Sequence, residues 1–253
     1  MKLGAQLFSV RKKLQCEEDI RSTFKTIKDI GYENVQLSGA CPMDANILRE
    51  ISEENALPIV CTHSPLDRII GDTDALIAEH KIFGCSVIGL GAMKKELRSS
   101  YEGLKEFFAL LEEPVKKIQD AGLNFAYHNH AFEFDILNDG VSKAYDIMLE
   151  TCESWHFILD TYWVSFAKHD PIEYIHKVGA KRLKNIHFKD LAKNEERSIC
   201  ACGDGVLDFS AIYEACVEEG VKNVLVEQDN AVEAPDMFAE MAKSFSHLRP
   251  IVK

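Results

Sequence analysis

The chain has 253 residues, of which 46% are hydrophobic and 28% charged, as in ordinary globular proteins, so it can bury a large core without disulfides. Its 29 basic and 41 acidic residues give a net charge of −12, which argues against nucleic-acid binding unless a local basic patch overrides it. No apolar run approaches the ~20 residues that span a bilayer, and the apolar stretch near the N-terminus is too short for a signal peptide.

Short apolar runs that are typical of strands alternate with amphipathic stretches that are typical of helices. The runs predict eight strands, at 3–8, 34–37, 58–61, 86–90, 124–127, 157–159, 183–186 and 224–226. Between them, helices are predicted up to Gly31, over 44–55 and 74–83, from Ser99 to Gly122, near 140–152, 171–178 and 208–219, and after Pro235. Ser99 and Glu102 have the spacing of a capping box, and Asp236 is a candidate cap for the last helix.

Regular alternation of this kind predicts parallel strands joined by crossover helices. Eight units of about 32 residues suit a closed (β/α)8 barrel, so we expect an α/β fold with a single TIM-barrel domain over residues 1–253. An open doubly wound sheet is the structural alternative. It has little support, because no GxGxxG follows a strand and no GxxxxGK[ST] occurs. No linker-like or low-complexity tract divides the chain.

The eight cysteines include no CxxC pair, and several lie inside apolar runs. This usage is typical of reduced, mostly buried thiols and predicts a cytoplasmic protein. The sequence leaves the oligomeric state open, and a homodimer is the commonest arrangement among soluble oligomers.

Polar residues gather where the predicted strands end. In a parallel barrel these ends meet on one face, which is where barrel enzymes carry their chemistry. The candidates in chain order are Gln6, Gln36, His63, His128, His130, Glu133, Asp160, His187, Lys189 and Glu227.

Four of these candidates are spaced by about one strand-and-helix unit: Glu133, Asp160, His187 and Glu227. Three carboxylates and an imidazole aimed at one point would repel one another unless a divalent cation lay between them. Oxygen-rich ligands with one nitrogen favour Mn²⁺, Mg²⁺ or Co²⁺, and the ligand types also allow Zn²⁺. Taken singly, an acidic residue after a strand is commonly a helix cap, and His63 can be an ordinary core histidine. The agreement of the spacings is what favours a shared site.

Several segments resemble the sugar phosphate isomerase/epimerase family, which has the xylose isomerase-like TIM barrel. They run from the first predicted strand to the last: GAQLFSVR at 4–11, GYENVQLSG at 31–39, YHNHAFEF at 127–134, LDTYWV at 159–164, HFKD at 187–190, GDGVLDF at 203–209 and VEQD at 226–229. The resemblance implies a divalent metal at the strand ends, held by Glu133, Asp160, His187 and Glu227. It also implies acid/base roles for the two glutamates and a site role for His63.

Four features depart from the family pattern, one of which is Lys168-His169-Asp170 in place of a more usual glycine-containing turn. Gln36 stands where many relatives carry Glu, Trp163 stands where ketose 3-epimerases tend to carry His, and Ala131 replaces a common Asp. These differences concern the substrate more than the metal site.

The resulting expectation is a metal-dependent sugar isomerase or epimerase that moves a proton next to a carbonyl through an enediolate. Glu133 and Glu227 would exchange the proton, and Lys189 and His63 would stabilise charge on oxygen. The residues expected to contact a sugar or polyol substrate are His128, His130, Trp163, Gln6 and Phe8.

Three alternatives share this barrel. A keto-sugar or inosose dehydratase or hydratase would use the same site, and Trp163 keeps this lyase interpretation open. A phosphodiesterase like the apurinic endonucleases would need a basic groove, against which the net charge argues. The third alternative is a sugar-binding barrel without turnover. The sequence names neither the sugar nor the metal, nor does it say whether the substrate is phosphorylated.

Overall fold

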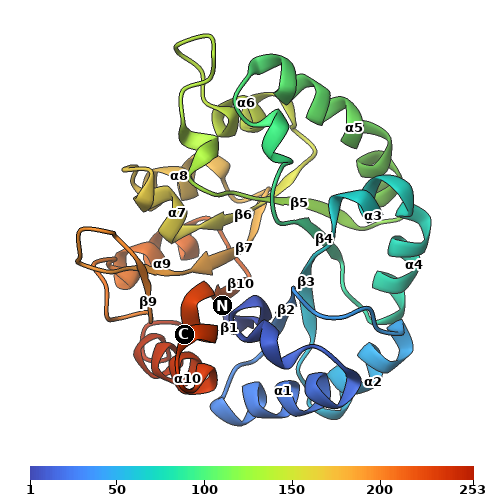
Figure 1. Ribbon diagram of the computed structural model, residues 1–253, viewed down its shortest axis with the longest axis vertical. Helices are drawn as coiled ribbons and strands as arrows, with labels where there is room; N and C mark the ends of the chain where they lie inside the picture. Colours follow the sequence, from blue (N-terminus) through green and yellow to red (C-terminus); the bar gives the residue numbers. More distant parts are fainter.

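Eight parallel strands form a closed barrel in the computed structural model, which describes residues 1–253 (Figure 1). Each strand pairs with the next strand of the barrel along the chain, and β10 pairs with β1 to close the ring. The barrel strands are β1 (Lys2–Gln6), β2 (Val35–Leu37), β3 (Ile59–His63), β4 (Val87–Leu90), β5 (Asn124–His128), β6 (His156–Asp160), β7 (Leu183–Phe188) and β10 (Asn223–Val226). The predicted (β/α)8 barrel is confirmed.

Helices surround the barrel, as Figure 1 shows. They are α1 (Glu17–Ile30), α2 (Ala45–Glu54), α3 (Leu66–Gly71), α4 (Thr73–Ile82), α5 (Tyr101–Asp120), α6 (Ala144–Thr151), α7 (Thr161–Phe166), α8 (Pro171–Val178), α9 (Phe209–Glu218) and α10 (Met237–Leu248). The short helices α3 and α7 were not predicted, nor was the antiparallel pair of β8 (Asp190–Leu191) and β9 (Ile199–Cys200). None of the helices combines the length and apolar character needed to cross a bilayer.

Several predicted boundaries are wrong by one to three residues; the third and seventh strands, for example, end at His63 and Phe188 instead of at 61 and 186. The first strand ends at Gln6 instead of continuing to residue 8, because the Gln6 side chain accepts a hydrogen bond from the Phe8 amide and starts a 3-10 helix, η1 (Leu7–Lys13). Helix α5 is capped by Ser100, whose Oγ accepts from the Gly103 amide at 3.0 Å, and not by Ser99. The predicted cap Asp236 is confirmed at α10.

A continuous core of 60 buried residues fills the space between barrel and helices. A separate cluster of four small or medium side chains comes from four neighbouring strands: Cys61, Val87, Ala126 and Ile158. Because side chains alternate between the two faces of a strand, we assign this cluster to the barrel interior. All eight cysteines are unpaired and five of them are buried.

Because side chains alternate between the two faces of a strand, every second residue lies on the inner wall of the barrel. A chain of amides joins three strands, since Asn34 donates to Asn223 and Asn223 donates to Asn185, each at 2.8 Å. Two residues beyond Asn185 on β7 lies His187, and two residues beyond that lies Lys189. Positions separated by two share a face, so these side chains follow the inner wall toward the carboxyl ends of the strands.

Candidate functional site

Four buried side chains converge at the carboxyl ends of β5, β6, β7 and β10: His128, Asp160, His187 and Glu227. One nitrogen or oxygen from each lies within 4.8 Å of the others. Nδ1 of His187 is 2.9 Å from Oε2 of Glu227 and 3.6 Å from Oδ2 of Asp160, and Nε2 of His128 is 3.3 Å from the same Asp160 oxygen. The register of β6 and β7 pairs Asp160 with His187, which sets both at one height in the barrel.

Hydrogen bonds behind the cluster orient its two imidazoles. His187 Nε2 lies 2.7 Å from Oε1 of the Gln36 side chain, and His128 Nδ1 lies 3.0 Å from the backbone carbonyl oxygen of Gly91. Each of these nitrogens donates its proton to that oxygen, so the other nitrogen of each ring faces the carboxylates and presents a lone pair when the ring is neutral. Two imidazole nitrogens and two carboxylates therefore face one another.

This donor set fits a divalent cation. Burial alone lowers the pKa of His187, but the Glu227 and Asp160 carboxylates outweigh it and raise that pKa to about 9. Burial raises the pKa values of Asp160 and Glu227, but the Lys189 ammonium and the neighbouring imidazoles bring both below their ordinary values. The cluster therefore attracts positive charge.

Lys189 is 1% exposed and lies beside the cluster. Its Nζ donates to Asp229 at 2.7 Å and to Glu227 at 3.4 Å, and the ammonium lies 5.1 Å from the centre of the Trp163 ring. Burial lowers the pKa of Lys189, but three nearby carboxylates, those of Glu227, Asp160 and Asp229, raise it above its ordinary value. The site thus contains a fixed positive charge.

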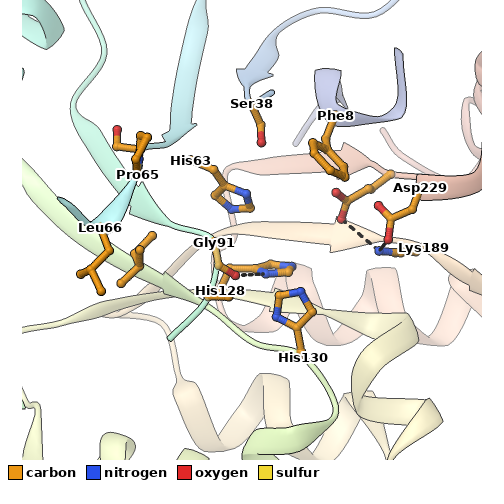
Figure 2. A pocket seen from close by; sticks show the side chains of 14 residues that line it. Phe8, Ser38, His63, Pro65, Leu66, Gly91, His128, His130, Lys189 and Asp229 are labelled. Atoms are coloured by element: carbon orange, nitrogen blue, oxygen red, sulfur yellow. Dashed lines mark hydrogen bonds and ion pairs between the residues drawn. The ribbon is translucent and has the colours of Figure 1, made fainter. Parts of the chain in front are cut away.

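A pocket of about 390 Å³ opens over these residues. Figure 2 shows His63, His128 and His130 together on one part of its wall and Lys189 beside Asp229 on another. Burial lowers the pKa of His63 and of His130, the latter to about 3, so both imidazoles are neutral at physiological pH. Of the residues predicted to act at the site, those that line the pocket are Phe8, His63, His128, His130, Lys189 and Glu227.

Two predicted substrate contacts lie behind the pocket wall. Gln6 is fully buried, with Nε2 3.5 Å from Nδ1 of His63. Trp163 packs against His130, with ring centres 5.2 Å apart. Neither lines the pocket, and each contacts a residue that does.

Glu133 lies outside the four-residue cluster. It belongs to a 3-10 turn, η3 (Phe132–Phe134), and its carboxylate accepts from the Tyr127 hydroxyl at 2.6 Å and from the His130 amide at 2.8 Å. His128 takes the fourth place that the spacing and the family resemblance gave to Glu133. Burial is the main reason that the pKa of Glu133 rises to about 7.

Sequence reasoning missed Asp229 as a site residue and His128 as a cluster member. Asp229 lines the pocket and accepts a hydrogen bond from Lys189. It is the last residue of the VEQD segment, whose resemblance to the family could have pointed to it. His128 follows the interior residue Ala126 by two positions, so strand alternation was the signal for its direction.

A profile of the family described as xylose isomerase-like TIM barrel matches residues 24–249. The chain belongs to the xylose isomerase-like TIM barrel family.

Similar proteins include enzymes of two kinds. The inosose dehydratase of Lacticaseibacillus casei is 25% identical over 85% of this chain and 84% of its own length. A sugar phosphate isomerase/epimerase structure from Parabacteroides distasonis superposes with a TM-score of 0.84 at 22% identity, over 100% of both chains. An L-ribulose 3-epimerase structure has a TM-score of 0.72 at 14% identity, over 98% of this chain and 93% of its own. At these identities, the likeness to the two structures shows that they share the fold of this chain.

Proposed function

We propose that the protein is a metal-dependent isomerase or epimerase that moves a proton next to the carbonyl of a sugar or polyol ketone. The observation that carries this proposal is the convergence of His128, Asp160, His187 and Glu227 on one point beside the pocket. The pocket is lined by two carboxylates, those of Glu227 and Asp229, and by the neutral imidazoles of His63 and His130. Proton transfer between carbon and oxygen requires groups of these kinds.

His128, Asp160, His187 and Glu227 would hold the cation, which when bound would draw electron density from a substrate carbonyl. With two imidazole nitrogens in the set, Mn²⁺, Co²⁺ or Zn²⁺ suits these ligands better than Mg²⁺, which prefers oxygen.

The proton-transfer roles follow from the pocket wall. Glu227 and Asp229 are its carboxylates, and Lys189 lies between them at hydrogen-bonding distance of both. We assign removal of the carbon-bound proton to this side, with the Lys189 ammonium stabilising charge on a substrate oxygen. His63 and His130 line the other part of the wall, and because their rings are neutral they would relay a proton by giving up one N–H proton while accepting another at the second ring nitrogen.

Glu133 has a positioning role in this scheme. Its carboxylate holds the His130 backbone amide and the Tyr127 hydroxyl, and it does not line the pocket. The second proton transfer, which the sequence assigned to Glu133, therefore passes to the imidazole side.

Dehydration of a keto-sugar or inosose is the second candidate. It is favoured by the 25% identity with an inosose dehydratase along most of both chains. After the carbon-bound proton has been removed, the adjacent C–O bond would break, a C=C bond would form, and a pocket imidazole would carry a proton to the departing hydroxyl, which leaves as water.

The test is incubation of the Mn²⁺-loaded protein with keto-sugars and inososes in D₂O, followed by mass spectrometry and NMR. Deuterium at the carbon next to the carbonyl, with the substrate mass otherwise kept, supports the isomerase. Loss of one water supports the dehydratase. Glu227→Gln should abolish both outcomes and Glu133→Gln should keep measurable exchange. Absence of exchange and product across the panel would contradict the proposal.

A further inference from the structure

A second cavity of about 630 Å³ adjoins the pocket. It lies among the segment after β2, helices α2, α3 and α4, and the end of β3. Four residues line both spaces: Ser38, His63, Ser64 and Pro65. In Figure 2, Ser38, His63 and Pro65 lie on the side of the pocket away from Lys189 and Asp229. The two spaces are therefore neighbours that share one wall.

Apolar side chains form much of the second cavity. Leu48 belongs to α2, Leu76 belongs to α4, and Phe83 is the residue that caps the end of α4. Each of the three is at least nine-tenths buried. Leu37 and Met43 add apolar surface from the end of β2 and the segment after it, and both are half-buried. Seven of the eighteen lining residues are hydrophobic, and ligand pockets combine such apolar surface with polar groups that fix orientation.

The charged groups of this cavity already have partners. Arg68 forms a two-point pair with Glu79, at 2.9 Å for each bond, and bonds Asp72 at 3.0 Å. A guanidinium that is occupied by two carboxylates has little capacity left for an anion. The wall thus carries no free positive charge for a phosphate or a carboxylate.

Three polar groups that line this cavity, those of His80, Thr62 and Ser64, form a chain of hydrogen bonds. His80 donates from Nδ1 to the Leu76 carbonyl at 2.7 Å, so its Nε2 accepts from the Thr62 hydroxyl at 2.9 Å. The Thr62 hydroxyl oxygen lies 3.1 Å from the Ser64 hydroxyl and accepts a hydrogen bond from it. The hydroxyl groups of Thr62 and Ser64 and the ring of His80 therefore use their donors within the protein.

The first pocket differs in this respect. Nε2 of His63 and Nδ1 of His130 are buried polar atoms without a hydrogen-bond partner, and both residues line the pocket. His63 also borders the second cavity. Because His63 Nδ1 faces the Gln6 amide nitrogen, Nε2 carries the proton and can donate to an oxygen at the junction.

We infer that the second cavity is a subsite for an uncharged, apolar group joined through oxygen to the sugar in the first pocket, such as the aryl group of a glycoside. The polar sugar would meet unpaired and charged groups, the aryl group would meet apolar side chains and satisfied polar ones, and His63 would bond the linking oxygen. This inference rests on the proposed function, because it takes a sugar to be the occupant of the first pocket.

The test compares 4-bromophenyl and methyl β-glycosides of several sugars for binding to the Mn²⁺-loaded protein by isothermal titration calorimetry. For at least one sugar, the aryl glycoside should bind about tenfold or more tightly than its methyl partner. Met43→Trp, which fills the second cavity, should remove that preference and leave methyl glycoside binding unchanged. Val217→Trp, at an exposed position on α9, is the matched control and should behave as wild type.

In a crystal soaked with the preferred aryl glycoside, the anomalous signal of bromine should lie near Leu48, Leu76 and Phe83. Equal affinities for aryl and methyl glycosides, a preference that survives in Met43→Trp, or bromine beside Lys189 would each overturn the inference. Deuterium exchange on keto-sugars without an aryl preference would overturn the subsite alone. An aryl preference without exchange or product would overturn the proposed function alone.

Discussion

The Tyr127 hydroxyl donates a hydrogen bond to Glu133 across 2.6 Å, and both side chains are fully buried. The other oxygen of Glu133 accepts from the His130 amide. This carboxylate thus ties the end of β5 to the turn that follows it, in the segment that places His128 and His130 at the site.

Glu133→Gln tests the ionisation of this carboxyl group. Burial, against the opposing effect of its hydrogen bonds, raises the pKa of Glu133 from 4.5 to about 7, so the folded state holds this proton more tightly than the unfolded chain. Its contribution to stability is therefore fully present below pH 4.5 and is lost as pH rises to about 7. Urea titrations in the presence of a metal chelator measure the free energy of unfolding of both proteins. The value for wild type minus the value for Glu133→Gln should fall as the pH rises from 4.5 to about 7. A flat or rising difference would contradict the assignment.

Gln36→Leu tests the orientation of His187. The substitution removes the acceptor of His187 Nε2, so the ring loses the bond that directs its other nitrogen at the carboxylates. Mn²⁺ affinity measured by calorimetry should fall about 10- to 100-fold. Gln36→Glu retains an acceptor and should bind Mn²⁺ more tightly than Gln36→Leu. Wild-type affinity in Gln36→Leu would show that His187 is held by other means.

Lys189→Met tests the fixed charge of the site. The half-buried Asp229 and the buried Glu227 would lose the ammonium that lies between them, which leaves Asp229 without a partner and Glu227 with His187 alone. Metal-free protein should lose about 3–5 kcal/mol of stability in urea denaturation at neutral pH. Adding Asp229→Asn should restore part of the loss. Strictly additive effects of the two substitutions would argue against the coupling.

Gly89→Ala tests packing inside the barrel. A Cβ at Gly89 would overlap the Thr62 carbonyl oxygen and approach Ile158 and Cys61. We expect a loss of about 1–3 kcal/mol, read as a lower Tm. Gly71→Ala is the control, because a Cβ there has no neighbour within 4 Å. Equal stability of the two variants would contradict the packing described for β4.

The barrel was predictable because alternating strand and helix patterns report local periodicity, which every unit repeats. Asp160, His187 and Glu227 were predictable for the same reason, since they lie at or just beyond the ends of strands whose register sets their height. Glu133 was not, because it lies in a 3-10 turn where spacing does not give side-chain direction.

The second cavity was beyond prediction for a related reason. Its walls combine an irregular segment after β2 with the short helix α3, and their approach depends on tertiary packing. The pairing of Arg68 with Glu79, and of His80 with Thr62, also joins residues whose relative positions no periodic pattern gives.

Metal content and Mn²⁺ stoichiometry, measured on wild type and on His128→Ala, His187→Ala and Glu133→Gln, test the central claim most directly. Wild type and Glu133→Gln should each bind one ion tightly per chain, and both histidine variants should lose it. Loss of the ion in Glu133→Gln with retention in His128→Ala would contradict the cluster, as would a wild-type protein that binds no ion.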